Sequence, residues 1–378
     1  MSINYWKYCR TQKLKGHYDA QCIPADAGIR IEAGPFSHSF RVVGEAWKQS
    51  QLNDFAAYSL AALSMSNGVG FNLLAPVSES VTKQIKALTD IYQFWAIRKT
   101  APLRMEFPLC ADATPTKTQR DGGIICLSGG VDSTYAAISE SKRGSVSHGL
   151  LIAGADYSHA DTQGFKELTT RVGQIADKLD LKLSIIETDI RKHRLNWDMM
   201  HGFTLAACLQ LMSAKHDHGY IALDYAGYQE IFAHPWGNNS ILPHYFSTTG
   251  FPIAGVGKSK RRVDKLAAIA EFDTSLLSNL SVCFSETSTG GNCGRCVKCV
   301  FSRILFTALD LDERSAFLST PSLEDAVDKM SVPKTYMGLR GRYLRVVETR
   351  QSLPKGPLHD KVSNYEEALR RAYIKKRN

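Results

Sequence analysis

The 378-residue chain lacks any uninterrupted apolar stretch approaching the roughly 20 residues that a membrane-spanning helix needs. Its first residues contain no apolar core of a secretory signal. Internal repeats and low-complexity tracts are also missing. We therefore expect a soluble, cytoplasmic protein that is not exported. In such a protein the nine cysteines should be reduced thiols or metal ligands rather than disulfides.

Length and charge indicate how the chain is organised. A chain with 44% hydrophobic residues and this length can bury two cores, since single domains seldom exceed about 250 to 300 residues. The net charge of +9 is uneven, because segment 331–378 holds 12 Lys or Arg and 4 Asp or Glu and so carries +8 by itself. This basic tail could hold a polyanion or an acidic partner protein, and a solvated helix would have the same composition. Binding of nucleic acid stays open.

Alternating strand and helix patterns begin after a polar linker near residue 115. Short apolar runs at 124–127, 149–153, 182–186 and 220–223 are separated by helical patterns. Such alternation predicts an α/β fold with a parallel sheet, helices on both faces and ligands at the carboxyl ends of the strands. We expect a small N-terminal α/β domain at 1–118, the parallel-sheet domain at 119–330 and the basic tail at 331–378.

A glycine-rich turn follows the first of these strands. Here the chain passes from a strand through a Ser-Gly-Gly turn directly into a helix, so that backbone amides converge at the positive end of the helix dipole. This pattern predicts a phosphate-binding loop, without the Lys of a Walker loop or the three glycines of a dinucleotide fingerprint. An ordinary Gly-rich turn is the alternative. The candidate residues are Ser128, Gly129, Gly130, Asp132, Ser133 and Thr134.

Charged residues near the strand ends are candidates for catalysis. Asp132 could meet Mg²⁺ beside a bound triphosphate, or it could act only as a helix cap. Asp156 follows a buried strand, where acids are often functional. In the basic run 258–265, Lys260 and Arg262 could stabilise a departing pyrophosphate, although a solvated helix start would look the same.

Loop 233–243 is rich in aromatic, amide and proline residues. Trp236 could stack on a planar heterocycle that Asn238 or Asn239 hydrogen-bonds. An ordinary surface loop is the alternative.

Four close cysteines predict a structural metal site. Cys283, Cys293, Cys296 and Cys299 can close a tetrahedron around Zn²⁺ and so form a zinc module at 283–299. An iron–sulfur cluster is the alternative, although the fourth cysteine lies upstream and no Cys-Pro follows.

The Ser-Gly-Gly-Val-Asp-Ser run at 128–133 resembles the signature of the PP-loop ATP pyrophosphatases, which cut ATP between its α and β phosphates. With the Cys-Gly-x-Cys-x-x-Cys run at 293–299, the segment from about Gly123 to Leu309 is similar to the 7-cyano-7-deazaguanine synthase family (QueC). The resemblance implies that Ser128, Gly129, Gly130, Asp132 and Ser133 hold pyrophosphate. It also implies that Asp156 and Tyr157 match the family's Asp-Tyr and that the four cysteines bind zinc.

The chain also departs from this family. The family's Arg-Asn pair is not evident around 197–203, and segment 224–237 lacks its usual substrate-recognition residues. The N-terminal unit and the basic tail are additions. The chain looks closer to the QueC-like proteins of antiviral defence operons, for which the resemblance implies transfer of an activated deazaguanine carboxylate to an amine of a protein.

The expected function is therefore that of a carbon–nitrogen ligase that forms AMP and pyrophosphate. It would adenylate a heterocyclic carboxylic acid with ATP and Mg²⁺, and then form an amide with a nitrogen nucleophile. The acceptor would be a protein amine, or free ammonia, whose amide would then be converted to the nitrile 7-cyano-7-deazaguanine. A PP-loop tRNA-modifying enzyme that uses the cysteines for sulfur or a cluster, and a zinc-containing binding protein with a vestigial ATP site, are the alternatives.

Overall fold

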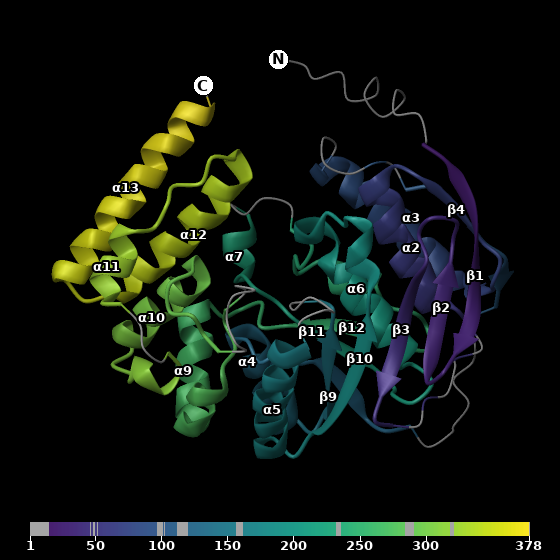
Figure 1. Ribbon diagram of the computed structural model, residues 1–378, viewed down its shortest axis with the longest axis horizontal. Helices are drawn as coiled ribbons and strands as arrows, with labels where there is room; N and C mark the ends of the chain where they lie inside the picture. The colour runs from purple at the N-terminus through teal and green to yellow at the C-terminus, as the bar shows by residue number, and fades with distance from the viewer. Residues whose placement is uncertain are drawn as a thin grey trace.

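The computed structural model describes residues 15–45, 47, 50, 52–96, 101, 103–111, 120–155, 162–231, 236–283, 291–317 and 321–377. It is an α/β structure with one large, mostly parallel sheet and helices on both of its faces (Figure 1). This confirms the predicted fold class at that level. In the described part of the chain, no helix is both long and apolar enough to cross a membrane.

Ten strands form the large sheet in the order β12-β11-β8-β9-β10-β3-β2-β1-β4-β6. They are β1 (His17–Ala25), β2 (Gly28–Glu32), β3 (His38–Val43), β4 (Gly70–Leu73), β6 (Met105–Glu106), β8 (Gly123–Cys126), β9 (Val146–Ala153), β10 (Lys182–Thr188), β11 (Gly219–Ala222) and β12 (Ile253–Val256). Two further strands, β5 (Val77–Ser78) and β7 (Leu109–Cys110), pair with each other.

The helices are α2 (Asp54–Asn67), α3 (Glu79–Ala96), α4 (Val131–Lys142), α5 (Thr162–Lys178), α6 (Trp197–Leu211), α7 (Gly227–Glu230), α8 (Leu242–Tyr245), α9 (Arg262–Phe272), α10 (Val297–Ala308), α11 (Leu323–Asp328), α12 (Tyr336–Ser352) and α13 (Pro357–Arg377). Short 3₁₀ turns lie at η1 (Ile190–His193), η2 (Thr274–Asn279) and η3 (Glu313–Ser315).

The parallel half of the sheet has a doubly wound strand order. Strand β8 is central, with β9 and β10 on one side and β11 and β12 on the other, and all four pairings are parallel. The chain therefore adds β9 and β10 on one side of β8 and then crosses to add β11 and β12 on the other side, so the winding reverses between β8 and β11. In open α/β sheets, ligands bind in the crevice outside the carboxyl ends of the strands at such a switch point.

Strand β8 separates two hydrophobic cores. Because successive side chains of a strand point to opposite faces, Ile124 and Cys126 enter the core beneath α2 and α6. Ile125 and Leu127 enter the core beneath α4, α5 and α9. Burial on both faces explains why the strand reads as a continuous apolar run.

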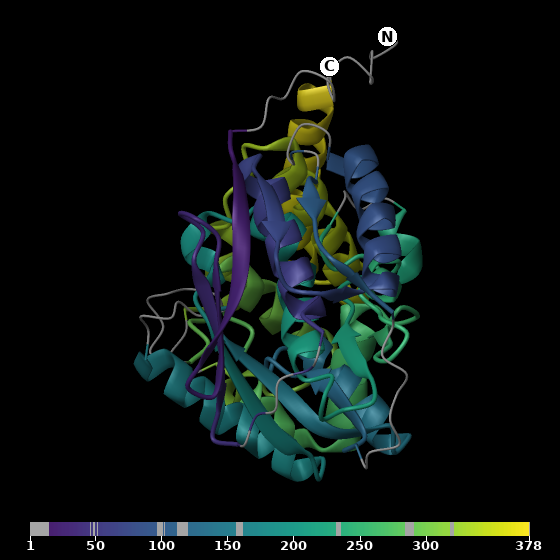
Figure 2. The ribbon, with the colours of Figure 1, turned by 90° about the vertical axis from the view of Figure 1, so that its right-hand side faces the viewer.

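The N-terminal segment extends the same sheet. Its hairpin of β2 and β3 pairs with β10 in antiparallel register, with Val42 opposite Ile186. Helix α2 packs against α6, and residues of both helices share one core with β8. Figure 2 shows the purple N-terminal strands beside the teal strands of the parallel half. The expected domain boundary at 118 lies outside the described residues, and the sheet is continuous across it.

The basic C-terminal segment folds into two long helices, α12 and α13, that pack on each other and on α10 and α11. Val346 and Leu369 are fully buried between them. Several of its basic groups are paired, with Arg350 on Glu366 and both Arg370 and Arg371 on Glu367. What the composition describes as a tail is therefore a packed helical unit.

Candidate functional site

The loop between β8 and α4 lies at the switch point of the sheet. Gly129 has a φ of +75°, and its carbonyl oxygen accepts a hydrogen bond from the Ser281 amide at 2.8 Å. A Cβ atom at Gly129 would lie 3.0 Å from Cγ2 of Val172. Both the backbone angle and the close approach favour glycine at this position.

Hydroxyl groups brace this loop from within. Oγ of Ser133 lies 3.2 Å from Oγ of Ser128, donates to the Gly130 carbonyl at 3.1 Å and accepts from the Ser128 amide at 3.3 Å. The first-turn amides of α4 have no intrahelical acceptor, and none of the described side chains caps them. Oγ1 of Thr134 is fully buried and has no hydrogen-bond partner among the described residues. The loop thus presents free donors around the positive end of a helix.

Asp132 on the first turn of α4 is held by two cations from α9. Nζ of Lys265 donates to Oδ1 of Asp132 at 2.8 Å, and the Arg262 guanidinium pairs with Oδ2. Lys265 is fully buried and also donates to the carbonyl oxygens of Leu223 and Asp224. Because Asp132 offers both oxygens to cations, its carboxylate fixes positive charge beside the loop. Both Asp132 oxygens thus already contact cations, whose positive charge would repel Mg²⁺.

The basic run divides where helix α9 begins. Arg262 is the first residue of α9 and Lys265 lies one turn later, so both point toward Asp132. Lys260 precedes the helix and is exposed. Burial lowers the pKa of Arg262, but Asp132 and Asp224 outweigh that effect and raise it above its ordinary value. Arg262 therefore remains charged, and its buried Nε has no partner among the described residues.

Asp224, directly after β11, is the second acid of the crevice. Its Oδ2 accepts a hydrogen bond from the Trp236 indole at 3.0 Å, and Arg262 lies 4.0 Å from its Oδ1. Burial raises the pKa of Asp224, but the positive charges of Arg262 and Arg345 outweigh burial and bring the pKa to about 2. Asp224 is therefore ionised at neutral pH.

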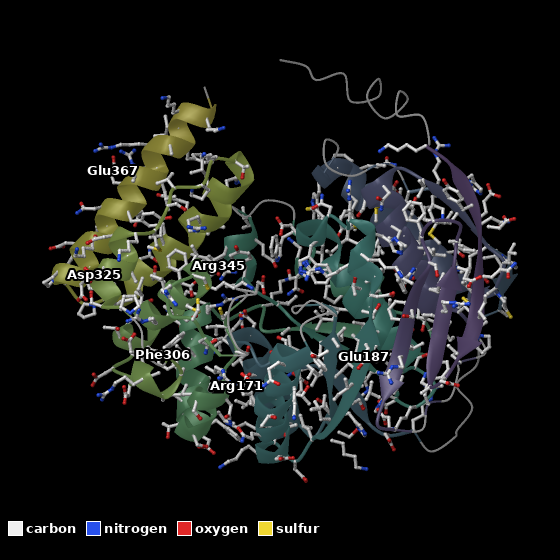
Figure 3. The ribbon with its side chains drawn as sticks, in the orientation of Figure 1. Arg171, Glu187, Phe306, Asp325, Arg345 and Glu367 are labelled. Carbon is white, nitrogen blue, oxygen red and sulfur yellow. The ribbon has the colours of Figure 1, made fainter. Side chains whose placement is uncertain are left out.

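Two residues of α12 also reach this region, and no sequence motif had indicated them. The Arg345 guanidinium lies 3.9 Å from Oδ2 of Asp224 and 5.1 Å from the ring centroid of Tyr225. Glu348 accepts hydrogen bonds from the Val263 amide at 3.1 Å and from the Gln229 side chain at 3.0 Å. Figure 3 labels Arg345 on the side of the C-terminal helices nearest α7.

The predicted substrate-binding residues have different surroundings. The Trp236 ring lies 5.2 Å from the His201 ring and borders Asp224. In contrast, Asn238 donates to the Ala222 carbonyl at 2.6 Å, and Asn239 accepts from the Ile241 amide at 3.1 Å. These amides hold the loop in place. Asp156 lies outside the described residues.

The four predicted cysteine ligands converge. The Sγ atoms of Cys283, Cys293, Cys296 and Cys299 all lie within 4.8 Å of one another. The pairs 283–296 and 293–299 are separated by 3.8 and 3.9 Å, close to the edge of about 3.8 Å in a tetrahedron with 2.3 Å Zn–S bonds. The cluster could hold a metal ion such as zinc, as predicted. It lies two residues from Ser281, which anchors the glycine loop.

Comparisons of the chain with family models, with curated proteins and with solved structures each found no match. The geometry alone therefore carries the functional argument. It combines an uncapped helix N-terminus, buried cations fixed beside it and a second acid across the switch point. Such an arrangement can bind an anion and stabilise charge that develops on it.

Proposed function

We propose that the chain is an ATP-dependent carbon–nitrogen ligase of the PP-loop type, similar to the 7-cyano-7-deazaguanine synthases. It adenylates a 7-deazaguanine-type carboxylic acid and transfers the acyl group to a nitrogen nucleophile. The observation that carries this proposal is the fixing of Arg262 and Lys265 by Asp132 beside the uncapped first turn of α4. Phosphoryl chemistry needs chiefly positioning and neutralisation of charge, which this arrangement supplies.

Two helix N-termini face this region, and their caps distinguish them. At α9 the Val263 amide is occupied by Glu348, and the Arg261 amide donates to Asp264 at 2.9 Å. At α4 the described residues supply no cap. We therefore assign the triphosphate to the Ser128–Thr134 loop, and the support for this is that the side-chain donors of Thr134 and Arg262 left without partners among the described residues would favour an anion.

The proposed reaction has two steps. A carboxylate oxygen of the acid attacks the α-phosphorus, the bond from that phosphorus to the bridging oxygen breaks, and pyrophosphate leaves. The nitrogen nucleophile then attacks the acyl carbon, AMP leaves with the bond electrons, and the nitrogen loses a proton. Arg262 stabilises the negative charge that builds on the leaving pyrophosphate, and the buried Lys265 holds Asp132 in place beside it. A protein amine is the proposed acceptor, and free ammonia is the alternative.

The side chains of the described residues fit Zn²⁺ but not Mg²⁺. Zn²⁺ fits the four cysteines, where it would hold the zinc module at 283–299 in place rather than take part in the reaction. Mg²⁺ does not fit the paired Asp132 carboxylate, so we derive no step through it. A magnesium ion would have to enter with the triphosphate itself.

Product analysis tests the proposal. Purified protein incubated with ATP, Mg²⁺ and 7-carboxy-7-deazaguanine, with ammonia or a protein amine as acceptor, should form AMP and pyrophosphate in equal amounts. The matched variants are Arg262→Met and Arg261→Met, because neighbouring Arg261 pairs with Asp264 at 2.9 Å instead of Asp132. Formation of ADP and phosphate, or equal activity of both variants, would overturn the assignment.

A further inference from the structure

Arg345 reaches the crevice from α12, a helix outside the parallel-sheet region. Its side chain is 19% exposed, and Asp224 at 3.9 Å is its only carboxylate partner among the described residues. Other arginines of α12 have closer partners: Arg350 pairs with Glu366, and Arg342 donates to the Tyr365 hydroxyl at 3.0 Å. Arg345 therefore stands out as a half-satisfied cation beside the site.

Arg345 is the most weakly paired cation of the crevice. The three cations Arg262, Lys265 and Arg345 face the three carboxylates Asp132, Asp224 and Glu348. Asp132 is occupied by Arg262 and Lys265, Glu348 accepts from the Val263 amide and Gln229, and Oδ2 of Asp224 accepts the Trp236 indole. Among the described residues, Arg345 therefore has no carboxylate oxygen closer than 3.9 Å. A largely buried guanidinium is costly without a close partner, so an anionic group of a ligand would stabilise it.

Glu348 holds Arg345 in this position. It lies one turn further along α12, so both side chains share a face of the helix. Glu348 is 7% exposed and accepts from the α9 backbone and from Gln229. These buried hydrogen bonds hold α12 against α9 and α7, the two helices that border the crevice. The guanidinium is thus placed before any ligand arrives, and the Tyr225 ring supports one of its faces.

We infer that Arg345 binds the carboxylate of the acid substrate, on the Tyr225 and Trp236 side of the crevice and across from the phosphate loop. The inference rests on the proposed function. A guanidinium supported on one face keeps its N–H edge available for a bidentate carboxylate. Trp236 lies beside the same Asp224, so an acid carrying a planar ring fits this wall. The C-terminal helices then complete the substrate site.

Binding of the acid without turnover tests the inference. Isothermal titration of the full-length protein with 7-carboxy-7-deazaguanine, in the presence of α,β-methylene ATP, should show affinity about 10- to 100-fold weaker for Arg345→Met than for the unmodified protein. Arg345→Lys should recover part of that loss. Arg350→Met is the matched control, because it removes an arginine of the same helix that is paired with Glu366. Its affinity for the acid should stay near that of the unmodified protein.

The outcomes separate the two proposals. Unchanged acid affinity in Arg345→Met, or no acid binding by the unmodified protein, overturns the inference. A loss of affinity for α,β-methylene ATP as large as the loss for the acid also overturns it, because Arg345 would then contact the nucleotide. A third outcome is that Arg345→Met selectively loses acid binding while the unmodified protein binds the acid but releases no AMP and pyrophosphate. This outcome supports the inference and overturns the adenylation reaction. If Arg345→Met and Arg350→Met lose melting temperature equally and also lose acid affinity equally, the loss comes from the packing of α12. That result overturns the binding role of Arg345.

Discussion

Replacing Lys265 by methionine should destabilise the protein far more than the same change at a surface lysine. Lys265 is fully buried, and its ammonium group contacts Asp132 at 2.8 Å. Removing one partner of a buried ion pair costs about 3 to 5 kcal/mol, because the other charge is left uncompensated. Asp132 keeps Arg262 in this variant, so we expect the lower end, a loss of about 3 kcal/mol in the free energy of unfolding.

Lys192→Met is the matched comparison for this prediction. Lys192 pairs with Asp189 at 2.6 Å, but its side chain is 48% exposed, so the pair should contribute less than about 1 kcal/mol. Equilibrium urea unfolding, followed by circular dichroism and by tryptophan fluorescence, measures both variants. Equal losses in the two variants would refute the claim that Lys265 is a buried structural cation. A further check is Asp132→Asn combined with Lys265→Met, whose loss should be smaller than the sum of the two single losses.

Three further predictions follow from the same contacts. Arg262→Met should lower the rate of pyrophosphate release about 10²- to 10³-fold, while Arg261→Met stays near the unmodified rate in a coupled phosphate assay; similar rates would contradict the role of Arg262. Cys296→Ser should lower bound zinc, measured by mass spectrometry of the purified chain, and weaken ATP binding, because Ser281 beside the cluster holds the Gly129 carbonyl; full zinc content would contradict the ligand set. Burial, with nearby His216 and Lys215, lowers the pKa of His148 from 6.5 to about 4. As pH falls, the His148 ring therefore takes up a proton in the unfolded chain before it does so in the folded chain. The free energy of unfolding should therefore fall between pH 6.5 and pH 4. An NMR titration should find the His148 ring neutral at pH 5, and a charged ring would refute the reasoning.

The parts of the site that local sequence could predict are those made by short segments. The Ser-Gly-Gly turn between an apolar strand and a helix is a local pattern, and the structure has that turn at the switch point of the sheet. The cysteine spacing likewise indicated four ligands, whose sulfur atoms converge. In both cases the residues that act together lie close in sequence.

The inward-facing cations could not be chosen from the sequence, because the face of a helix depends on where the helix begins. Lys260 and Lys265 belong to one basic run, but α9 starts at Arg262, which leaves Lys260 before the helix and buries Lys265. Arg345 and Glu348 were missed for a different reason. Their contacts join residues more than 80 positions apart, and a basic helix with no partner in view has the composition of a solvated one.

The pairing of β3 with β10 has a consequence for any attempt to shorten the chain. A chain starting after residue 119 would keep the glycine loop and the cysteines, but it would uncover the outer side of Lys182–Thr188 and the apolar surface of α6 that α2 covers. A bare strand with unpaired amides and carbonyls is a template for joining another chain. Such a fragment should therefore come out of purification as soluble aggregates or as dimers joined through β10, even though every proposed catalytic group described here would still be present.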